Sequence, residues 1–136
     1  MLEIGAFPFL VKKGKIYIML ITNSSGKLWI LPKGQPEKNL NQAQVAELES
    51  YEEAGVKGKV INSRLHKEFK RDNSNTLEIY PLLIKKTLTE WPEDSYRKRR
   101  LVSIKEALLL VTRKEHVNAI KHFSKPENSK ILLKYI

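Results

Sequence analysis

Residues 42–55 read QAQVAELESYEEAG, and the rest of the fold can be argued outward from them. The stretch has no Gly or Pro before Gly55, and most of its residues have good helix propensity. Asn41 stands where an N-cap is needed, and Gly55 stands where a helix ends in the left-handed conformation. The sequence therefore predicts a helix from Gln42 to Ala54.

Three carboxylates lie on one face of this predicted helix. Glu49 and Glu53 are one turn apart and Glu52 follows Glu49 by three positions, so all three fall within an arc of roughly 100°. They repel one another, and the macrodipole also disfavours anions at the C-terminal end of a helix. A hard divalent cation such as Mg²⁺ offsets this repulsion, because it takes carboxylates, carbonyls and waters as ligands. Three helical carboxylates on their own are more often a solvated acidic face, so the choice between such a face and a metal site depends on the residues around them.

The segments on either side of the helix predict strands. Ala6–Val11 and Lys15–Thr22 are short runs rich in β-branched and aromatic residues, and Leu28–Leu31 is a shorter run of the same kind. After the helix, Lys57–Arg71 and Thr76–Leu88 predict a hairpin around the polar turn between them.

Two further helices are expected near the C-terminus. Ser103 with Glu106 and Thr112 with Glu115 both have the spacing of a capping box. Strands, a helix, more strands and terminal helices together predict an α+β fold, with helices packed on a mixed sheet, and the sequence does not give the topology.

The composition narrows the class of protein. A chain of 136 residues with 41% hydrophobic residues fits one domain, residues 1–136. The absence of cysteine excludes disulfides, thiolate zinc sites and cysteine nucleophiles. A formal net charge of +10 favours encounters with anions such as nucleotides, polyphosphates, nucleic acid or acidic headgroups. No apolar run approaches the roughly 20 residues that span a bilayer and the N-terminus lacks the features of a secretory signal, so we expect a cytoplasmic protein.

The residues around the carboxylates resemble the Nudix box of the MutT-like Nudix hydrolases. Trp29–Gly34 (WILPKG) is followed at the family's spacing by Glu49, Glu52–Glu53 and Gly55–Val56. In that family the box runs Gly, five residues, Glu, seven residues, Arg-Glu, an aliphatic residue, any residue, Glu-Glu, any residue, Gly and an aliphatic residue. The resemblance implies the Nudix fold, an α/β/α sandwich with a mixed β-sheet and a catalytic helix.

The same resemblance implies roles for particular residues. The metal, Mg²⁺ or Mn²⁺, would be held by Glu49, Glu52, Glu53 and the Gly34 carbonyl, with Glu49 and Glu53 as catalytic residues. The general base is either Glu53 or a separate loop carboxylate, and the sequence does not decide between them. The phosphates of the substrate would be bound by Lys33, Arg97, Lys98 and Arg99.

Downstream residues resemble the branch of the family that hydrolyses diphosphoinositol polyphosphates and diadenosine polyphosphates. The residues in question are Trp91, Glu93–Ser95, Arg97–Arg99 and Glu106–Ala107. The implied reaction is metal-dependent hydrolysis of a phosphoanhydride in a nucleotide derivative, a dinucleoside polyphosphate or a diphosphoinositol-like substrate. The diphosphoinositol branch carries basic residues where this chain has Leu2–Ile4, which counts against an inositol substrate.

The chain departs from the box at two charged positions. Leu40 stands where the family has Glu and Leu48 where it has Arg, and we hypothesise that the two leucines pack together in place of the lost charges. Arg100 occupies a position that is often a further Glu. Glu68 or Glu78 could supply the missing carboxylate, although each is expected to be an exposed strand residue.

Two other readings follow from the same residues. The first is a Nudix-fold module that binds a phosphorylated ligand or nucleic acid with little or no turnover, against which the retained glutamates argue. The second is an unrelated nucleic-acid-binding domain, which would need an aromatic stacking surface that the scattered tyrosines do not supply. The three histidines show no ligand spacing with the glutamates and are expected to have surface or packing roles. They are His66, His116 and His122.

Overall fold

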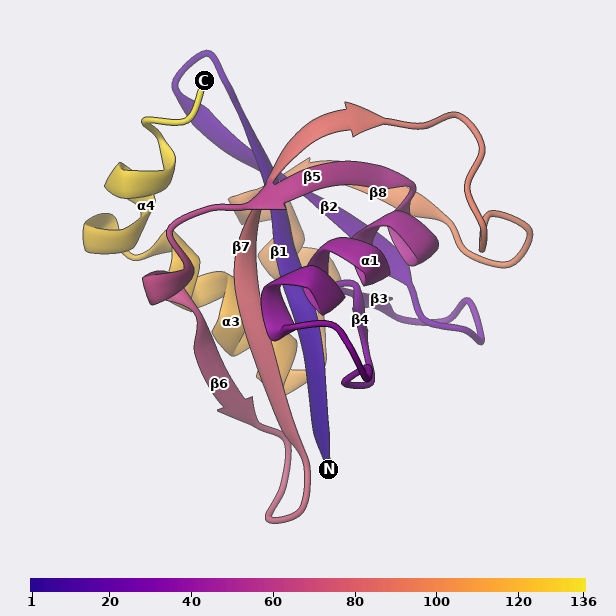
Figure 1. Cartoon of the computed structure of the whole chain (residues 1–136). Helices are drawn as coiled ribbons and strands as arrows, with labels where there is room; N and C mark the ends of the chain where they lie inside the picture. The colour runs from indigo at the N-terminus through magenta and orange to yellow at the C-terminus, as the bar shows by residue number, and fades with distance from the viewer.

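The computed structural model describes residues 1–136, and a mixed β-sheet lies at its centre (Figure 1). Its main path has the order β3-β2-β1-β7-β5, with β4 paired to β1, β6 to β7 and β8 to β2. Strand β1 pairs antiparallel with β2 and parallel with β7, so the sheet is mixed, as predicted. The strands are β1 (Leu2–Lys12), β2 (Lys15–Thr22), β3 (Trp29–Ile30), β4 (Lys33–Gly34), β5 (Val56–Val60), β6 (Lys67–Lys70), β7 (Thr76–Thr87) and β8 (Arg99–Ser103).

Helices cover both faces of the sheet, as Figure 1 shows. One apolar core lies between the sheet and α1, where Val45, Ala46 and Ala54 pack on alternate residues of the strands. The other core lies between the opposite face and the C-terminal helices, which contribute Ile120 and Phe123 among others. The helices are α1 (Gln42–Ala54), α2 (Ile104–Leu110), α3 (Lys114–Ser124) and α4 (Pro126–Leu132). The predicted α/β/α arrangement is therefore confirmed, and none of the helices has the length and apolarity needed to cross a membrane.

Helix α1 begins and ends where the sequence predicts. The Asn41 side chain accepts a hydrogen bond from the Gln44 backbone N–H, and the Gln44 side chain accepts one from the Asn41 N–H. This reciprocal capping box satisfies two backbone donors that the first turn leaves free. Gly55 ends the helix with φ of 65°, a left-handed conformation that glycine adopts without a Cβ penalty.

The predicted strand Lys57–Arg71 is wrong in one respect, because it is interrupted. Strand β5 pairs with the C-terminal half of β7, whereas β6 pairs with residues Thr76–Ile79 at its other end. Between them the chain turns through Asn62, with φ of 45°, and a single 3₁₀ turn at Ser63–Leu65. Strand β7 is 12 residues long, so one of its edges accepts two short partners in succession.

The start of the third helix also differs from the prediction. Ser103 caps α2 by accepting a hydrogen bond from the Glu106 backbone N–H at 3.1 Å, as its spacing indicates. Thr112 caps nothing, because α3 begins at Lys114 with Arg113 in the N-cap position. Val111 is buried and forms a β-bridge with Trp29, which keeps the chain extended past the point where the sequence pattern places a helix.

Candidate active site

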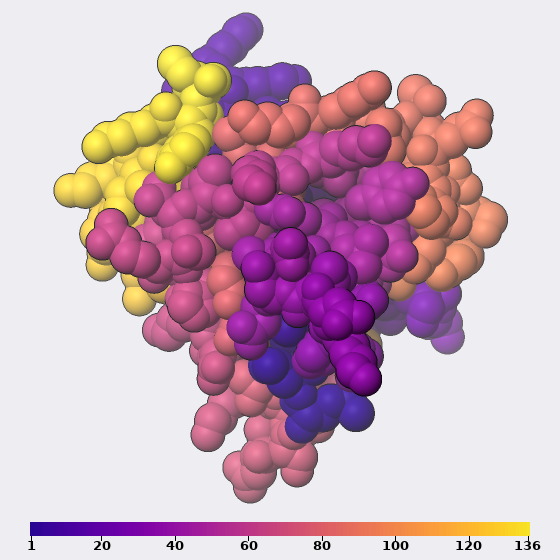
Figure 2. All heavy atoms as spheres, viewed as in Figure 1, coloured from indigo at the N-terminus to yellow at the C-terminus, as the bar shows by residue number.

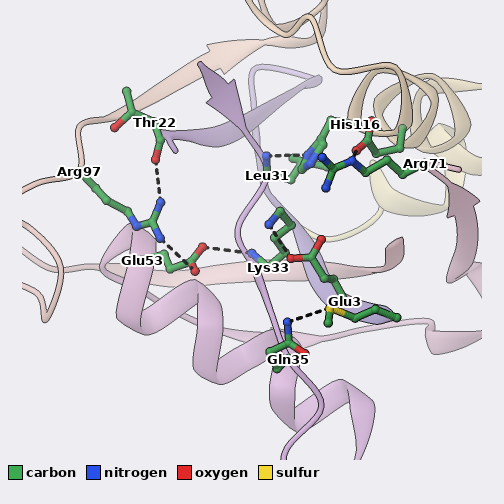
Figure 3. Close-up of polar contacts among 11 residues, drawn as sticks. Glu3, Thr22, Leu31, Lys33, Gln35, Glu53, Arg71, Arg97 and His116 are labelled. Atoms are coloured by element: carbon green, nitrogen blue, oxygen red, sulfur yellow. Dashed lines mark hydrogen bonds and ion pairs between the residues drawn. The ribbon is translucent and has the colours of Figure 1, made fainter. Parts of the chain in front are cut away.

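The carboxylates of α1 lie against the segment that joins β3 to β4. Glu49 and Glu53 are buried, with 8% and 7% of their surface exposed, and Glu52 is half-buried. The Lys33 backbone N–H donates a hydrogen bond to Glu53 Oε1 at 3.1 Å (Figure 3). A Cβ at Gly34 would collide with the Glu49 carboxyl, so the absence of a side chain there is what lets Glu49 lie against the strand. The structure thus brings together the box residues predicted to form the site.

Arg97 holds Glu53 from the other side. Its Nη2 lies 3.3 Å from Glu53 Oε2 and its Nη1 donates to the Thr22 carbonyl at 2.9 Å (Figure 3). Its Nε donates to Glu93 Oε1 at 2.6 Å. Only 10% of the Arg97 side chain is exposed. The guanidinium of Arg97 is thus engaged three times within the protein, and its binding of substrate phosphate stays a prediction. Its role is to fix the position of a site carboxylate.

Burial and mutual repulsion raise the pKa values of the carboxylates on α1. Burial raises the pKa of Glu49 to about 8, and the negative charges of Glu53, Glu52 and Glu93 add to the effect. Burial also raises the pKa of Glu53 to about 7, although Arg97 and the Lys33 N–H act in the opposite direction. The pKa of Glu52 is raised by burial, Glu37 and Glu93. Because Arg97 is the one cation paired with Glu53, the negative charge of the cluster exceeds its compensation.

A divalent cation fits this excess of buried carboxylate oxygen. Such ions prefer carboxylate and carbonyl ligands, and the cluster offers both without a competing lysine on Glu49 or Glu52. As placed, no three acidic or histidine side chains form a ready-made ligand set, so binding would require them to rotate toward a common point. The oxygen donors of the cluster therefore suit a divalent metal, but their side chains do not yet point toward one ion.

Glu93 belongs to the cluster and was missed as a site residue from the sequence. Its backbone N–H donates to the Glu52 carbonyl at 3.1 Å, which anchors the loop before β8 to the end of α1. Its carboxylate binds Arg97 four positions later in the chain. That four-residue spacing of opposite charges was the signal available in the sequence. Glu93 is a separate loop carboxylate next to the helix glutamates.

Arg99 has a structural role, and its binding of substrate phosphate stays a prediction. Its guanidinium donates to the carbonyls of Ala54 at 3.0 Å and Gly55 at 3.3 Å, and also to that of Leu88. It lies 4.0 Å over the Trp91 ring, whose Nε1 donates to the Glu53 carbonyl at 3.0 Å. A cation at the C-terminal end of a helix satisfies free carbonyls and complements the macrodipole. Arg99 and Trp91 together stabilise the end of α1 that carries Glu53.

We expect Arg99→Ala to lower the free energy of unfolding by about 2–3 kcal/mol, because it leaves partly buried carbonyls without a charged donor. Lys98→Ala is the matched control, since Lys98 is the adjacent basic residue and its side chain is exposed. Its effect should stay within about 0.5 kcal/mol. Urea denaturation measures both, and equal losses in the two variants would contradict the assigned role.

The other two predicted phosphate ligands, Lys33 and Lys98, differ in whether their side chains are paired within the protein. Lys33 Nζ lies 2.7 Å from Glu3 Oε2, so the side chain of Lys33 is paired within the protein. Lys98 is exposed and makes no ion pair, and its backbone N–H donates to the Thr22 hydroxyl at 2.9 Å. Figure 2 shows the N-terminal residues lying beside the segment that leads into α1. Glu3 on β1 forms its ion pair with Lys33 on β4. Of the four predicted ligands, only Lys98 keeps an unpaired charge.

The two substituted box positions have different surroundings. Leu40 packs against the apolar core under α1, whereas Leu48 lines a shallow groove beside Tyr51 and Val56. The hypothesis that the two leucines pack together therefore receives no support. Arg100 pairs with Glu106 at 2.6 Å on the surface.

The two strand carboxylates considered as replacements have different surroundings. Glu68 is exposed, as expected. Glu78 is buried, contrary to expectation, and accepts a hydrogen bond from the Tyr80 hydroxyl at 2.8 Å. Glu78 is adjacent to Ile4 in the sheet, and Ile4 in turn pairs with Gly34, so one strand separates Glu78 from the box.

Comparison with known proteins identifies the fold. No family model matches the chain. It is similar to solved Nudix structures: an Ap4A hydrolase binary complex from C. elegans (TM-score 0.69, 18% identity, 98% of each chain) and a NUDIX hydrolase from Nitrosomonas europaea (TM-score 0.71, 18% identity, 90% of this chain and 68% of that one). The fold is therefore that of the Nudix hydrolases.

Sequence similarity agrees with the fold. Over 114 residues the chain is 33% identical to Nudix hydrolase 21, chloroplastic, of Arabidopsis thaliana, covering 79% of this chain and 58% of that protein. The chain is therefore similar to Nudix hydrolases in both sequence and fold. It spans less than two thirds of the length of this curated relative.

Proposed function

We propose that this protein hydrolyses a phosphoanhydride bond of a small phosphorylated substrate with the help of Mg²⁺ or Mn²⁺. The observation that carries the proposal is the cluster of the half-buried Glu52 with the buried Glu49 and Glu53, which has more negative charge than Arg97 offsets. An acidic cluster of this kind is unfavourable for folding alone and becomes favourable when a cation is bound. The similarity of the chain to Nudix hydrolases supports a hydrolase.

The proposed ligands are the three glutamates of α1 and the Gly34 carbonyl. A cation bound there would cancel phosphate charge and make a bound water easier to deprotonate. The protein's own contribution is to hold Glu53 in one orientation, through the Lys33 backbone N–H on one oxygen and Arg97 on the other. The base that receives the proton from water is Glu53 or Glu93, since both carboxylates lie in the cluster.

The surroundings favour a substrate with few phosphates. Lys33, Arg97 and Arg99 are all engaged within the protein, which leaves Lys98 as the free cation of the predicted set. A densely phosphorylated inositol needs several free cations, whereas a nucleotide derivative or dinucleoside polyphosphate needs fewer. The ion pair of Glu3 with Lys33 places a further carboxylate beside the box, and its negative charge also disfavours a densely phosphorylated substrate.

The test is a phosphate-release screen with Mg²⁺ and then Mn²⁺ over nucleoside diphosphate derivatives, dinucleoside polyphosphates and diphosphoinositols. We expect activity on the nucleotide substrates, and a loss of about 100-fold in kcat for Glu53→Gln and Glu49→Gln. Glu93→Gln belongs in the panel because it separates the two candidate bases. A larger kcat loss in Glu93→Gln than in Glu53→Gln would assign the base to the loop.

Glu47→Gln is the matched control for this screen. Glu47 is on the same helix, but its carboxylate accepts a hydrogen bond from the Val60 backbone N–H at 2.9 Å, away from the cluster. An amide oxygen can accept the same bond, so this variant should retain nearly full activity. Unchanged activity in both Glu49→Gln and Glu53→Gln would remove the proposed site.

A second candidate function is a module that binds a phosphorylated ligand with little turnover. The observation in its favour is that the box has lost two charges, at Leu40 and Leu48, while three of the four predicted phosphate ligands are occupied. Calorimetric titration with the substrates of the screen distinguishes the two functions. Micromolar binding without release of phosphate under any metal condition would support the module.

A further inference from the structure

A buried histidine on α3 contacts the segment that supports the active-site carboxylates. His116 is 0% exposed, and its Nδ1 accepts a hydrogen bond from the Leu31 backbone N–H at 3.1 Å. Figure 3 shows this contact on one side of the segment and Glu53 on the other. Since α1 and α3 cover opposite faces of the sheet, the Leu31–Gly34 segment connects the two sides.

The imidazole of His116 acts only as an acceptor toward Leu31. Burial lowers the pKa of His116 to about 3, with Lys33, Arg113 and Arg71 adding positive charge nearby. The ring is therefore neutral, and because Nδ1 accepts, Nε2 carries the proton. Nε2 has no hydrogen-bond partner in the protein. An unpaired buried donor is unfavourable, so the benefit of a histidine here is its acceptor for Leu31.

The residues that follow Leu31 reach the carboxylates directly. The Pro32 carbonyl accepts a hydrogen bond from the Ala6 N–H at 3.0 Å, and the next residue is Lys33, whose N–H binds Glu53. Strand β1 approaches this segment so closely that a Cβ at Gly5 would collide with the Pro32 oxygen. The segment is thus held at two successive residues before it meets Glu53 and Glu49.

We propose that His116 is a positioning residue for the active site, acting through the backbone of Leu31–Gly34 on Glu53 and Glu49. The inference rests on the proposed function where it concerns rate. Without the acceptor, the Leu31 N–H loses its hydrogen bond to His116. The backbone of the next two residues, Pro32 and Lys33, is then held less firmly. Small displacements of a group that orients a catalytic carboxylate cost rate even when the substrate still binds.

The test compares two substitutions of His116 in the full chain. His116→Asn keeps an acceptor, because Oδ1 of asparagine occupies nearly the place of Nδ1, whereas His116→Leu removes it. We expect His116→Leu to lower kcat about tenfold with KM within about twofold, and His116→Asn to stay within about threefold of wild-type kcat. In NMR spectra the amide signals of Lys33 and Gly34 should shift in the leucine variant, and exchange of the Lys33 amide should be at least about tenfold faster.

Phe123→Leu is the control for a general loss of stability. Phe123 is fully buried on the same helix, two turns after His116, and stacks on Phe7 with ring centroids 4.8 Å apart. At a temperature where all variants are folded, Phe123→Leu should leave kcat and the Lys33 amide signal unchanged. An equal kcat loss in Phe123→Leu and His116→Leu would overturn the positioning role, as would an unmoved Lys33 amide in His116→Leu. A wild-type protein without turnover would remove the proposed function, and the amide signals would then decide the role of His116 alone.

Discussion

Replacing Arg97 by methionine is expected to lower the free energy of unfolding by about 3–5 kcal/mol. The side chain of Arg97 is 10% exposed and contacts Glu53 at 3.3 Å and Glu93 at 2.6 Å. Its removal leaves two carboxylates close together with no cation between them, and it also leaves the Thr22 carbonyl without its donor at 2.9 Å. Loss of one partner from a buried charge network is more destabilising than loss of the whole network.

Urea denaturation in the absence of divalent metal measures this effect, and Arg100→Met is the matched control. Arg100 pairs with Glu106 at 2.6 Å, but its side chain is 50% exposed, so the control should change stability by no more than about 1 kcal/mol. The double variant Arg97→Met/Glu93→Gln should recover part of the loss, because it removes one of the two stranded charges. A loss for Arg97→Met no larger than that of Arg100→Met would contradict the assignment of Arg97 to a buried network.

The helix that carries the site could be predicted from the sequence because its signals are local. Asn41 and Gly55 define the ends of α1 through contacts within four residues of themselves. The face on which Glu49, Glu52 and Glu53 lie follows from the geometry of any α-helix. These features depend on no other part of the chain.

The interruption between β5 and β6 could not be predicted, because it depends on a distant strand. The composition of residues 57–71 suits a continuous strand, and only the length of β7 gives the segment two places to pair. The start of α3 is a similar case. The capping-box spacing at Thr112 is overridden by the bridge between Val111 and Trp29, which are far apart in sequence.

The basic run Arg97–Arg99 shows the same limit within the site. The sequence alone does not distinguish the roles of three adjacent basic residues, and binding of phosphate is the natural interpretation for all of them. In the folded chain Arg97 turns to Glu53 and Glu93, Lys98 is exposed, and Arg99 turns to the end of α1. Which charge is free is decided by long-range packing, and this is why the substrate cannot be chosen from the motif.

The metal-free protein is expected to lose on the order of 2 kcal/mol of stability as the pH rises from 6.5 to 8. The pKa of Glu49 is raised from 4.5 to about 8, and that of Glu53 from 4.5 to about 7. In this range the folded protein keeps protons that the unfolded chain has already released. Unfolding therefore releases protons, and stability falls as the pH rises toward the pKa values of the folded state.

The histidines determine the lower end of the pH range in which this loss of stability is expected. The pKa of His116 is lowered from 6.5 to about 3, and that of His122 is lowered as well. At low pH the unfolded chain binds protons that the folded His116 and His122 do not, so the contribution of these two residues to stability increases with pH and opposes that of the glutamates. Between pH 6.5 and about 7.5 the unfolded chain releases the rest of these histidine protons, so the opposing contribution fades and the carboxylates dominate the slope.

Thermal or urea unfolding in EDTA across this pH range measures the slope, and Glu49→Gln identifies its source. An amide at position 49 cannot ionise, so the variant should show a shallower slope and greater stability than wild type at pH 8. Glu47→Gln, on the same helix but bonded to Val60, should keep the wild-type slope. A wild-type slope that Glu49→Gln leaves unchanged would show that the cluster is not the source. Mg²⁺ should also raise the stability of the wild-type protein at pH 8, because it offsets the charge of the cluster, and it should not raise that of Glu49→Gln. This pair of results would show that the cation binds the same carboxylates that cause the pH dependence.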